Sequence, residues 1–324
     1  MYLYDSPPSG AQRGTAIFLG ELSGVTKRER VQDSTKAPYR WICALDVHFP
    51  GQDKRRSRIQ ATGFLISPRH IVTAARNLVR GSTPEANWRK EPGKRVDALK
   101  VTVTPALNGA PALGKKRAPA GSIDLKPPDW WLPNQYLYSD LGVRWDVAVL
   151  TLPKELPAVG GAHYGHWGDI HFSPRTSIEP ATTATLAGTT LTTCGYADEW
   201  CIREPSLPSA AKPGSKPSAP VTFMKGSESG PWQTFGRVPL DQQPAAAQIG
   251  AVVYDAAGCQ GMTGAPLWLN TGSLRLVGVH IKSDGANTDN PELPPRVGVG
   301  LPLRSEILDV LRQRVKLAGL QPTF

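Results

Sequence analysis

Long apolar runs are missing from this sequence. No stretch approaches the roughly 18 consecutive apolar residues of a membrane-spanning helix, so we expect no membrane span. The N-terminus has neither the basic start nor the apolar run of a secretory signal peptide. We therefore expect secretion or export by a route that needs no signal peptide, with a removed leader or a cytoplasmic location as alternatives.

Patterns that bind metals or nucleic acids are also missing. There is no Cys-x-x-Cys pair and the six histidines are scattered, so we expect neither a metal nor another cofactor. The formal charge is +10, from 37 Lys and Arg against 27 Asp and Glu. The basic clusters lack interleaved stacking aromatics, which argues against nucleic acid and favours solvated loops, although an acidic partner stays open. These clusters lie at 27–30, 54–58, 89–95 and 115–117.

Cysteine is scarce, with four residues in the chain. This number fits a protein that meets an oxidising compartment but does not require one. Cys194 and Cys201 are disulfide candidates that could staple a loop, and Cys43 reads as an ordinary buried thiol. Cys259 lies four residues before Thr263, where a bridge would brace that region. Spacing alone leaves the pairing open.

Glycine (32) and proline (31) are plentiful, and runs rich in Val, Ile, Thr and Leu recur between them. This composition predicts a mostly β protein with many short strands and turns. Near the C-terminus, apolar residues at helical spacing instead predict a helix, for which Ser305 is a candidate N-cap. The predicted strands are 40–49, 59–66, 71–75, 145–152, 182–193, 247–254, 265–269 and 274–281, and the helical positions are Ile307, Leu308, Leu311 and Val315.

Three short motifs follow one another in a fixed order. The first, at 62–78, reads TGFLISPRHIVTAARNL; the second, at 145–150, reads WDVAVL; the third, at 258–268, reads GCQGMTGAPLW and is followed by VGVHIK. Each alone is weak evidence, because Gly-x-x-Gly turns are common. All three in this order resemble the trypsin-like (chymotrypsin-like) serine proteases. There, a strand ends in Thr-Ala-Ala-His, an Asp opens a hydrophobic strand, and Gly-x-Ser-Gly-x-Pro presents the nucleophile.

The resemblance implies an all-β fold of two antiparallel six-stranded β-barrels with a C-terminal α-helix. It covers residues 28 to 316 and leads us to expect a monomer. The division we expect is an N-terminal extension at 1–29, a first barrel at 30–158, a second at 159–302, and a helix and tail at 303–324. By its position, the extension resembles a pro-segment.

The glutamyl endopeptidase branch of the family is the most similar. It shares a polar opening like 30–35, an Asn after the catalytic His (here Asn77), a His in the Gly-Val-His strand (His280) and an ending like 298–301. By this resemblance His280 would bind substrate and favour an acidic side chain, because a cationic or donor imidazole offsets desolvation of a carboxylate. The alternative is a hydrogen-bonded structural histidine.

Two catalytic side chains of the family are absent from this chain. The resemblance places Arg76 at the position of the general base, Asp146 at that of the carboxylate and Thr263 at that of the nucleophile, with an oxyanion hole at Gly261 and Thr263. A guanidinium does not accept a proton at neutral pH, and a hydroxyl nucleophile needs a base beside it. His70 cannot replace the base, since six residues of strand span on the order of 20 Å.

We expect Asp146 to be largely buried between the barrels, where it needs a cationic partner, because an unpaired buried carboxylate is costly. Arg76 leaves the same strand end as the family's His, so we predict a direct Arg76–Asp146 ion pair.

We expect a serine endopeptidase scaffold that is inactive in this chain, acting on proteins or peptides by resemblance. The alternative is a pseudoprotease that binds a peptide or protein in its cleft. The substitutions fit a natural pseudoenzyme or a disabled variant; an active enzyme would need a different, unrecognised base.

Overall fold

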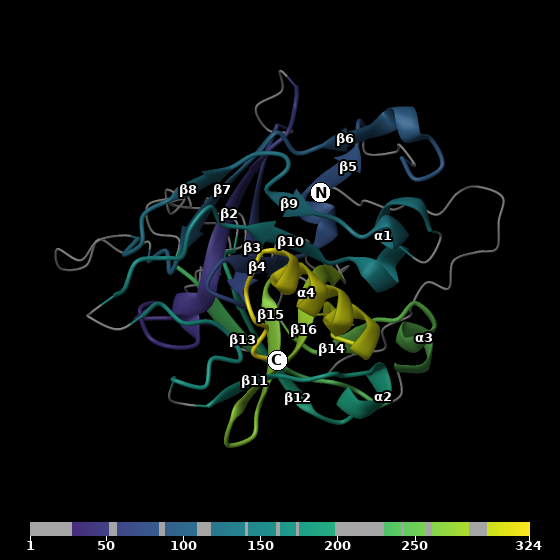
Figure 1. The fold of residues 1–324 in the computed structure, drawn as a ribbon. Coiled ribbons are helices and arrows are strands. Elements are labelled where there is room, and N and C mark those ends of the chain that lie inside the picture. Colours follow the sequence, from purple (N-terminus) through teal and green to yellow (C-terminus); the bar gives the residue numbers. More distant parts are fainter. Residues whose placement is uncertain are drawn as a thin grey trace, which may run out of the picture.

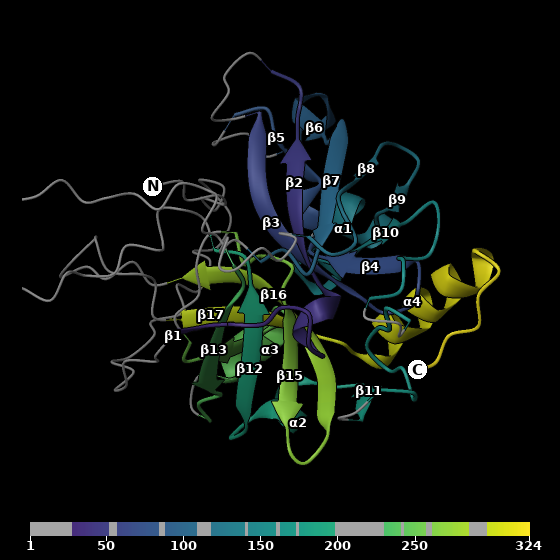
Figure 2. The same cartoon turned by 90° about the vertical axis from the view of Figure 1, so that its left-hand side faces the viewer.

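Two barrel-like sheets stack one above the other in the computed structural model, and α4 (Ser305–Leu317) lies beside their junction (Figures 1 and 2). The structure describes residues 28–51, 57–83, 88–108, 118–139, 142–159, 163–172, 175–197, 230–240, 243–256, 261–284 and 297–324. In these ranges no helix is long and apolar enough to cross a bilayer. The architecture confirms the predicted mostly-β, two-barrel fold with a C-terminal helix.

The first sheet contains seven strands from one continuous part of the chain. Their order is β8 (Ile123–Leu125), β7 (Lys100–Pro105), β2 (Ile42–His48), β3 (Arg58–Leu65), β4 (His70–Thr73), β10 (Ala148–Thr151) and β9 (Trp130–Trp131). A separate hairpin pairs β5 (Val79–Gly81) with β6 (Arg95–Asp97). A short helix, α1 (Asn134–Tyr138), precedes β10. The sheet has one strand more than the six that we expected.

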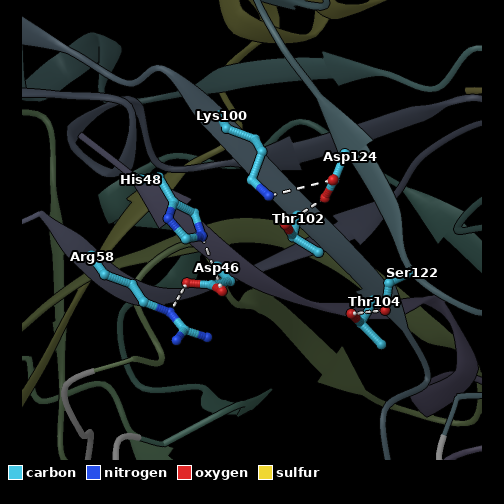
Figure 3. A network of polar contacts seen from close by, with 8 residues as sticks. All are labelled: Asp46, His48, Arg58, Lys100, Thr102, Thr104, Ser122 and Asp124. Carbon is cyan, nitrogen blue, oxygen red and sulfur yellow. Dashed lines mark hydrogen bonds and ion pairs between the residues drawn. The ribbon is translucent and has the colours of Figure 1, made fainter. Parts of the chain in front are cut away.

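Alternation along β2 and β7 separates a buried face of the first sheet from a polar one. Leu45, Val47, Val101 and Val103 are buried, while the residues between them face solvent. The outer face carries polar contacts, most of them between neighbouring strands (Figure 3). They are Arg58–Asp46 at 2.5 Å, His48–Asp46 at 3.2 Å, Lys100–Asp124 at 3.3 Å, Thr102–Asp124 at 2.6 Å and Thr104–Ser122 at 2.8 Å. Such exposed pairs contribute little to stability.

The second sheet contains eight strands, two more than expected. The path is β1 (Arg28–Arg30), β13 (Trp232–Arg237), β12 (Thr190–Gly195), β15 (Pro266–Asn270), β16 (Leu274–Asp284), β17 (Val297–Pro302) and β14 (Val252–Tyr254). β11 (Thr176–Ile178) pairs with β16 in parallel, so this sheet is not wholly antiparallel. Two helices, α2 (Thr183–Leu186) and α3 (Gln243–Gln248), lie in its connections.

The first strand of the chain belongs to the second sheet. Residues 28–30 form β1, which pairs with β13 in register from Arg28 with Thr234 to Arg30 with Trp232. The expected boundary between an extension at 1–29 and a first barrel from 30 therefore cuts through a strand of the other barrel. Residues 1–27, most of the proposed pro-segment, lie outside the described ranges.

Three local predictions need correction. The strand expected at 182–193 begins instead as α2, because the Thr182 and Thr185 hydroxyls form a reciprocal capping box with each other's backbone N–H groups, at 3.2 and 2.9 Å. Similarly, α3 occupies the start of the strand expected at 247–254. The N-cap of α4 is Arg304 rather than Ser305, which is the first residue of the helix and makes no capping bond.

The C-terminal helix packs on the larger of the core clusters, to which both sheets contribute. All four apolar positions predicted for its inner face are buried in that core: Ile307, Leu308, Leu311 and Val315. A separate cluster fills the second barrel, with Leu267, Val252 and Tyr254 among its members. The larger core cluster also contains Cys194, Trp268 and Val279 of the second sheet, so the two barrels share it. The candidate site lies where their edges meet.

Candidate active site between the two barrels

Arg76 and Asp146 form the predicted ion pair. Arg76 lies in a 3₁₀ turn (Ala75–Asn77) directly after β4, and its Nε donates to Oδ2 of Asp146. Its backbone N–H donates to the other carboxylate oxygen, Oδ1, at 2.9 Å. The Asp146 side chain is 0% exposed and that of Arg76 is 26% exposed. The predicted ion pair is therefore confirmed, and both oxygens of Asp146 accept from Arg76.

This pairing leaves the site without a proton acceptor at position 76. A guanidinium has only donors and stays protonated at neutral pH. His70 does not supply the missing base, because it lies at the opposite end of β4 from Arg76 and contacts Ser67 Oγ through its Nδ1 at 2.6 Å. Burial, helped by the charge of Arg69, lowers the pKa of His70 to about 4.

The turn that carries Thr263 has a glycine before it and another after it, each in a backbone conformation that favours glycine. Gly261 and Gly264 both have φ of +93°, in the left-handed region. A Cβ at Gly264 would lie 2.0 Å from the Thr62 carbonyl oxygen and 2.3 Å from Thr73 Oγ1. Gly264 therefore allows the turn to approach the first barrel closely.

Side chains of the first barrel hold this turn in place. Thr62 Oγ1 donates to the Gly261 carbonyl at 2.8 Å, and the Thr62 N–H donates to the Thr263 carbonyl at 2.9 Å. Asn77 Nδ2 donates to the same Thr263 carbonyl and to Thr73 Oγ1, both at 2.9 Å. Thr62, Thr73 and Asn77 are all buried. We call these three residues the turn clamp.

The turn clamp was only partly predictable from the sequence. Asn77 stood out beside Arg76 through the family resemblance, but Thr62 and Thr73 did not, since buried threonines are ordinary in strands. Their one sequence signal is that both belong to the first motif, at 62–78.

Thr263 itself is half-buried, and its backbone contacts Asn77, the residue that follows Arg76. Its carbonyl is held by the clamp, yet among the described residues its hydroxyl has no hydrogen-bond partner. Among the described residues the arrangement thus has a carboxylate, a hydroxyl and a tightly held turn, but no group hydrogen-bonded to the hydroxyl that could take its proton.

Comparison with solved structures identifies the fold that carries this arrangement. A Glu endopeptidase, solved in complex with MPD, superposes with a TM-score of 0.55 at 17% identity, over 90% of this chain and 97% of that one. The protease Anisep from Arthrobacter nicotinovorans superposes with a TM-score of 0.51 at 15% identity, over 87% and 96%. The chain has the chymotrypsin fold. No protein-family model and no curated protein sequence matches it.

Within this chymotrypsin fold, His280 is a buried, uncharged residue. It lies on β16 with no exposed surface, and its Nδ1 is 2.5 Å from the hydroxyl of Tyr254. Gly298 makes room for that tyrosine, since a Cβ there would be 2.4 Å from the ring. Burial, with the charge of Arg76, lowers the pKa of His280 to about 3. An imidazolium that attracts acidic side chains is therefore excluded at neutral pH, whereas recognition by a neutral donor stays a prediction.

The buried His280 makes the stability of the fold depend on pH. Its pKa in the folded state lies below the ordinary value of 6.5, so its contribution is complete above about pH 6.5 and is lost as the pH falls towards 3. We expect the free energy of unfolding to fall by about 1.4 kcal/mol per pH unit for this group. Urea unfolding measured between pH 7 and 5 gives this free energy at each pH. For His280→Asn, the plot of unfolding free energy against pH should have a correspondingly shallower slope.

The control for this measurement is His171→Asn, at an exposed position. It should leave the slope unchanged. An unchanged slope in His280→Asn would contradict the assignment of a neutral, buried imidazole.

The disulfide suggested at Cys194 is not formed. Cys194 is a fully buried free thiol on β12, where its side chain joins the core rather than a loop. Cys201 and Cys259 lie outside the described ranges. Cys43 is also a buried free thiol, as predicted.

Proposed function

We propose that this chain keeps the scaffold of a trypsin-like serine endopeptidase without its hydrolytic activity, and that its cleft binds peptide or protein segments. The observation that carries the proposal is the double contact of Arg76 with Asp146. Arg76 supplies a permanent donor at the position that the family resemblance assigns to the base, and it occupies the carboxylate that would orient a base.

The retained backbone donors and turn of the site support the binding of a peptide or protein segment in the cleft. The backbone N–H groups of Gly261 and Thr263 do not depend on the side chain at 263, and the turn clamp holds the carbonyls of both residues. The shape of this turn depends on the clamp residues, so a chain without catalysis keeps the turn only while these residues are present. All three clamp side chains are present and hydrogen-bonded.

We expect casein and labelled peptides to be bound by the chain without hydrolysis above the rate without protein. A fluorescence assay for cleavage and anisotropy for binding, on the same labelled peptides, test the two halves separately. Heat-unfolded protein is the control for nonspecific binding. Hydrolysis that copurifies with the folded chain and is blocked by a serine-protease inactivator would contradict the proposal.

A further inference from the structure

The altered centre carries a different charge from a site with histidine at position 76. A neutral imidazole beside ionised Asp146 leaves one net negative charge, whereas the guanidinium of Arg76 brings the pair to zero. Asp146 is fully buried, while a quarter of the Arg76 side chain is exposed. The solvent-facing member of the pair is thus the cation, and an anion near the turn meets less repulsion than it would beside histidine.

The turn next to this pair directs a backbone donor outward. The Met262 carbonyl accepts from the Ala265 N–H at 2.9 Å, inside the turn. In a trans peptide the C=O and the following N–H point in opposite directions, so the Thr263 N–H points away from the turn interior. In the part of the chain that the structure describes, no residue accepts from the N–H of Thr263 or of Gly261.

The turn clamp holds the peptide units on both sides of the one that carries the Thr263 N–H. Thr62 contacts the carbonyls on both sides of Met262, and its Oγ1 also accepts from the N–H of Tyr196, the residue after β12, at 3.0 Å. Thr73 Oγ1 in turn donates to the Thr62 carbonyl at 2.6 Å. Donors held in this way bind an oxygen without reorganising first.

From this juxtaposition we infer that the centre is a carboxylate site, which binds the C-terminus of a polypeptide in preference to an internal peptide bond. One carboxylate oxygen would accept from the N–H groups of Gly261 and Thr263, with its charge next to Arg76. An internal peptide bond offers only a neutral carbonyl there. A histidine-containing centre would oppose the carboxylate. The inference rests on the proposed function, in that it requires peptides to enter the cleft.

Two peptide libraries test the inference. Random fluorescein-labelled hexapeptides without Asp or Glu are made as free acids and as C-terminal amides, and binding to the full chain is followed by anisotropy. We expect the free acids to bind at least about tenfold more tightly, a difference of about 1.4 kcal/mol. The preference should be constant from pH 6 to 9, because Arg76 does not titrate there. It should shrink at high salt.

Four variants separate charge from geometry. Arg76→Gln should abolish the preference for the acid, whereas Arg76→Lys keeps the charge and should retain most of it. Thr62→Val removes the hydroxyl that holds Gly261 and should weaken free-acid binding at least fivefold. Thr62→Ser is the matched control that keeps the hydroxyl. Melting curves show whether each variant is folded.

The outcomes distinguish the inference from the proposed function. Equal affinity for the two libraries overturns the carboxylate site but leaves peptide binding standing. Tight binding of an amidated library that contains Glu, equal to that of the free acids, would assign the site to acidic side chains and overturn the preference for a C-terminus. Binding of neither library by folded protein overturns the proposed function as well.

Discussion

Changing Arg76 to His and Thr263 to Ser together is expected to raise peptide hydrolysis at least about 10³-fold above the unmodified chain. The carboxylate is already buried at the strand end where the imidazole would lie, and the clamped turn is already formed. Only the base and a nucleophile that fits the turn are missing. Base and nucleophile act as a unit, so each single reversion should stay within about tenfold of background.

The measurement is release of fluorophore from internally quenched peptides, with active-site titration to count competent molecules. The matched control adds Asp146→Asn to the double reversion. That triple variant should lose most of the gain, because an amide no longer orients the imidazole in the productive tautomer. Activity restored by Thr263→Ser alone would show that Arg76 is not disabling, and the reading of the site would be wrong.

Removing one partner of the Arg76–Asp146 pair is expected to destabilise the fold by about 3–5 kcal/mol. In Arg76→Ala a fully buried carboxylate keeps no cation, and in Asp146→Asn the guanidinium loses its counter-charge. The net contribution of the intact pair is smaller than this loss, since desolvation offsets much of the attraction. Thermal melts should show a decrease in Tm on the order of 10 °C for each variant.

An exposed ion pair of the same chain is the control. Arg95 Nε lies 2.8 Å from Asp97 Oδ1, and half of the Asp97 side chain is exposed. Asp97→Asn should cost less than about 1 kcal/mol, because solvent screens such pairs. A double change of Arg76 and Asp146 to Met and Leu should be less destabilising than either single change. If the single changes cost no more than Asp97→Asn, the pair is not the buried contact described above.

Both expected effects depend on contacts between residues that are far apart in the sequence. Seventy residues separate Arg76 from Asp146, and 117 more lead to Thr263. Family resemblance, not periodicity, placed the three together beforehand. The chemistry of the residues then predicted the ion pair. A buried carboxylate next to an arginine is far more stable when it pairs with the guanidinium than when it is left unpaired.

The sequence by itself determined the β-rich fold class, the strands with clear alternation and the inner face of α4. It also determined that position 76 holds no proton acceptor, since that is a property of the guanidinium alone. These features depend on residue type and local spacing, which a linear pattern records directly.

Only the tertiary structure decided the assignment of β1 to the second sheet, the burial of His280 against Tyr254 and the clamp of Thr62, Thr73 and Asn77 on the turn. Threonine 182 illustrates the reason. The β-branched threonines around it favour a strand, yet the hydroxyl of a threonine can equally well cap the start of a helix. Which partner a hydroxyl, an imidazole or an edge strand meets is set by elements far away in the chain, and no local pattern contains that information.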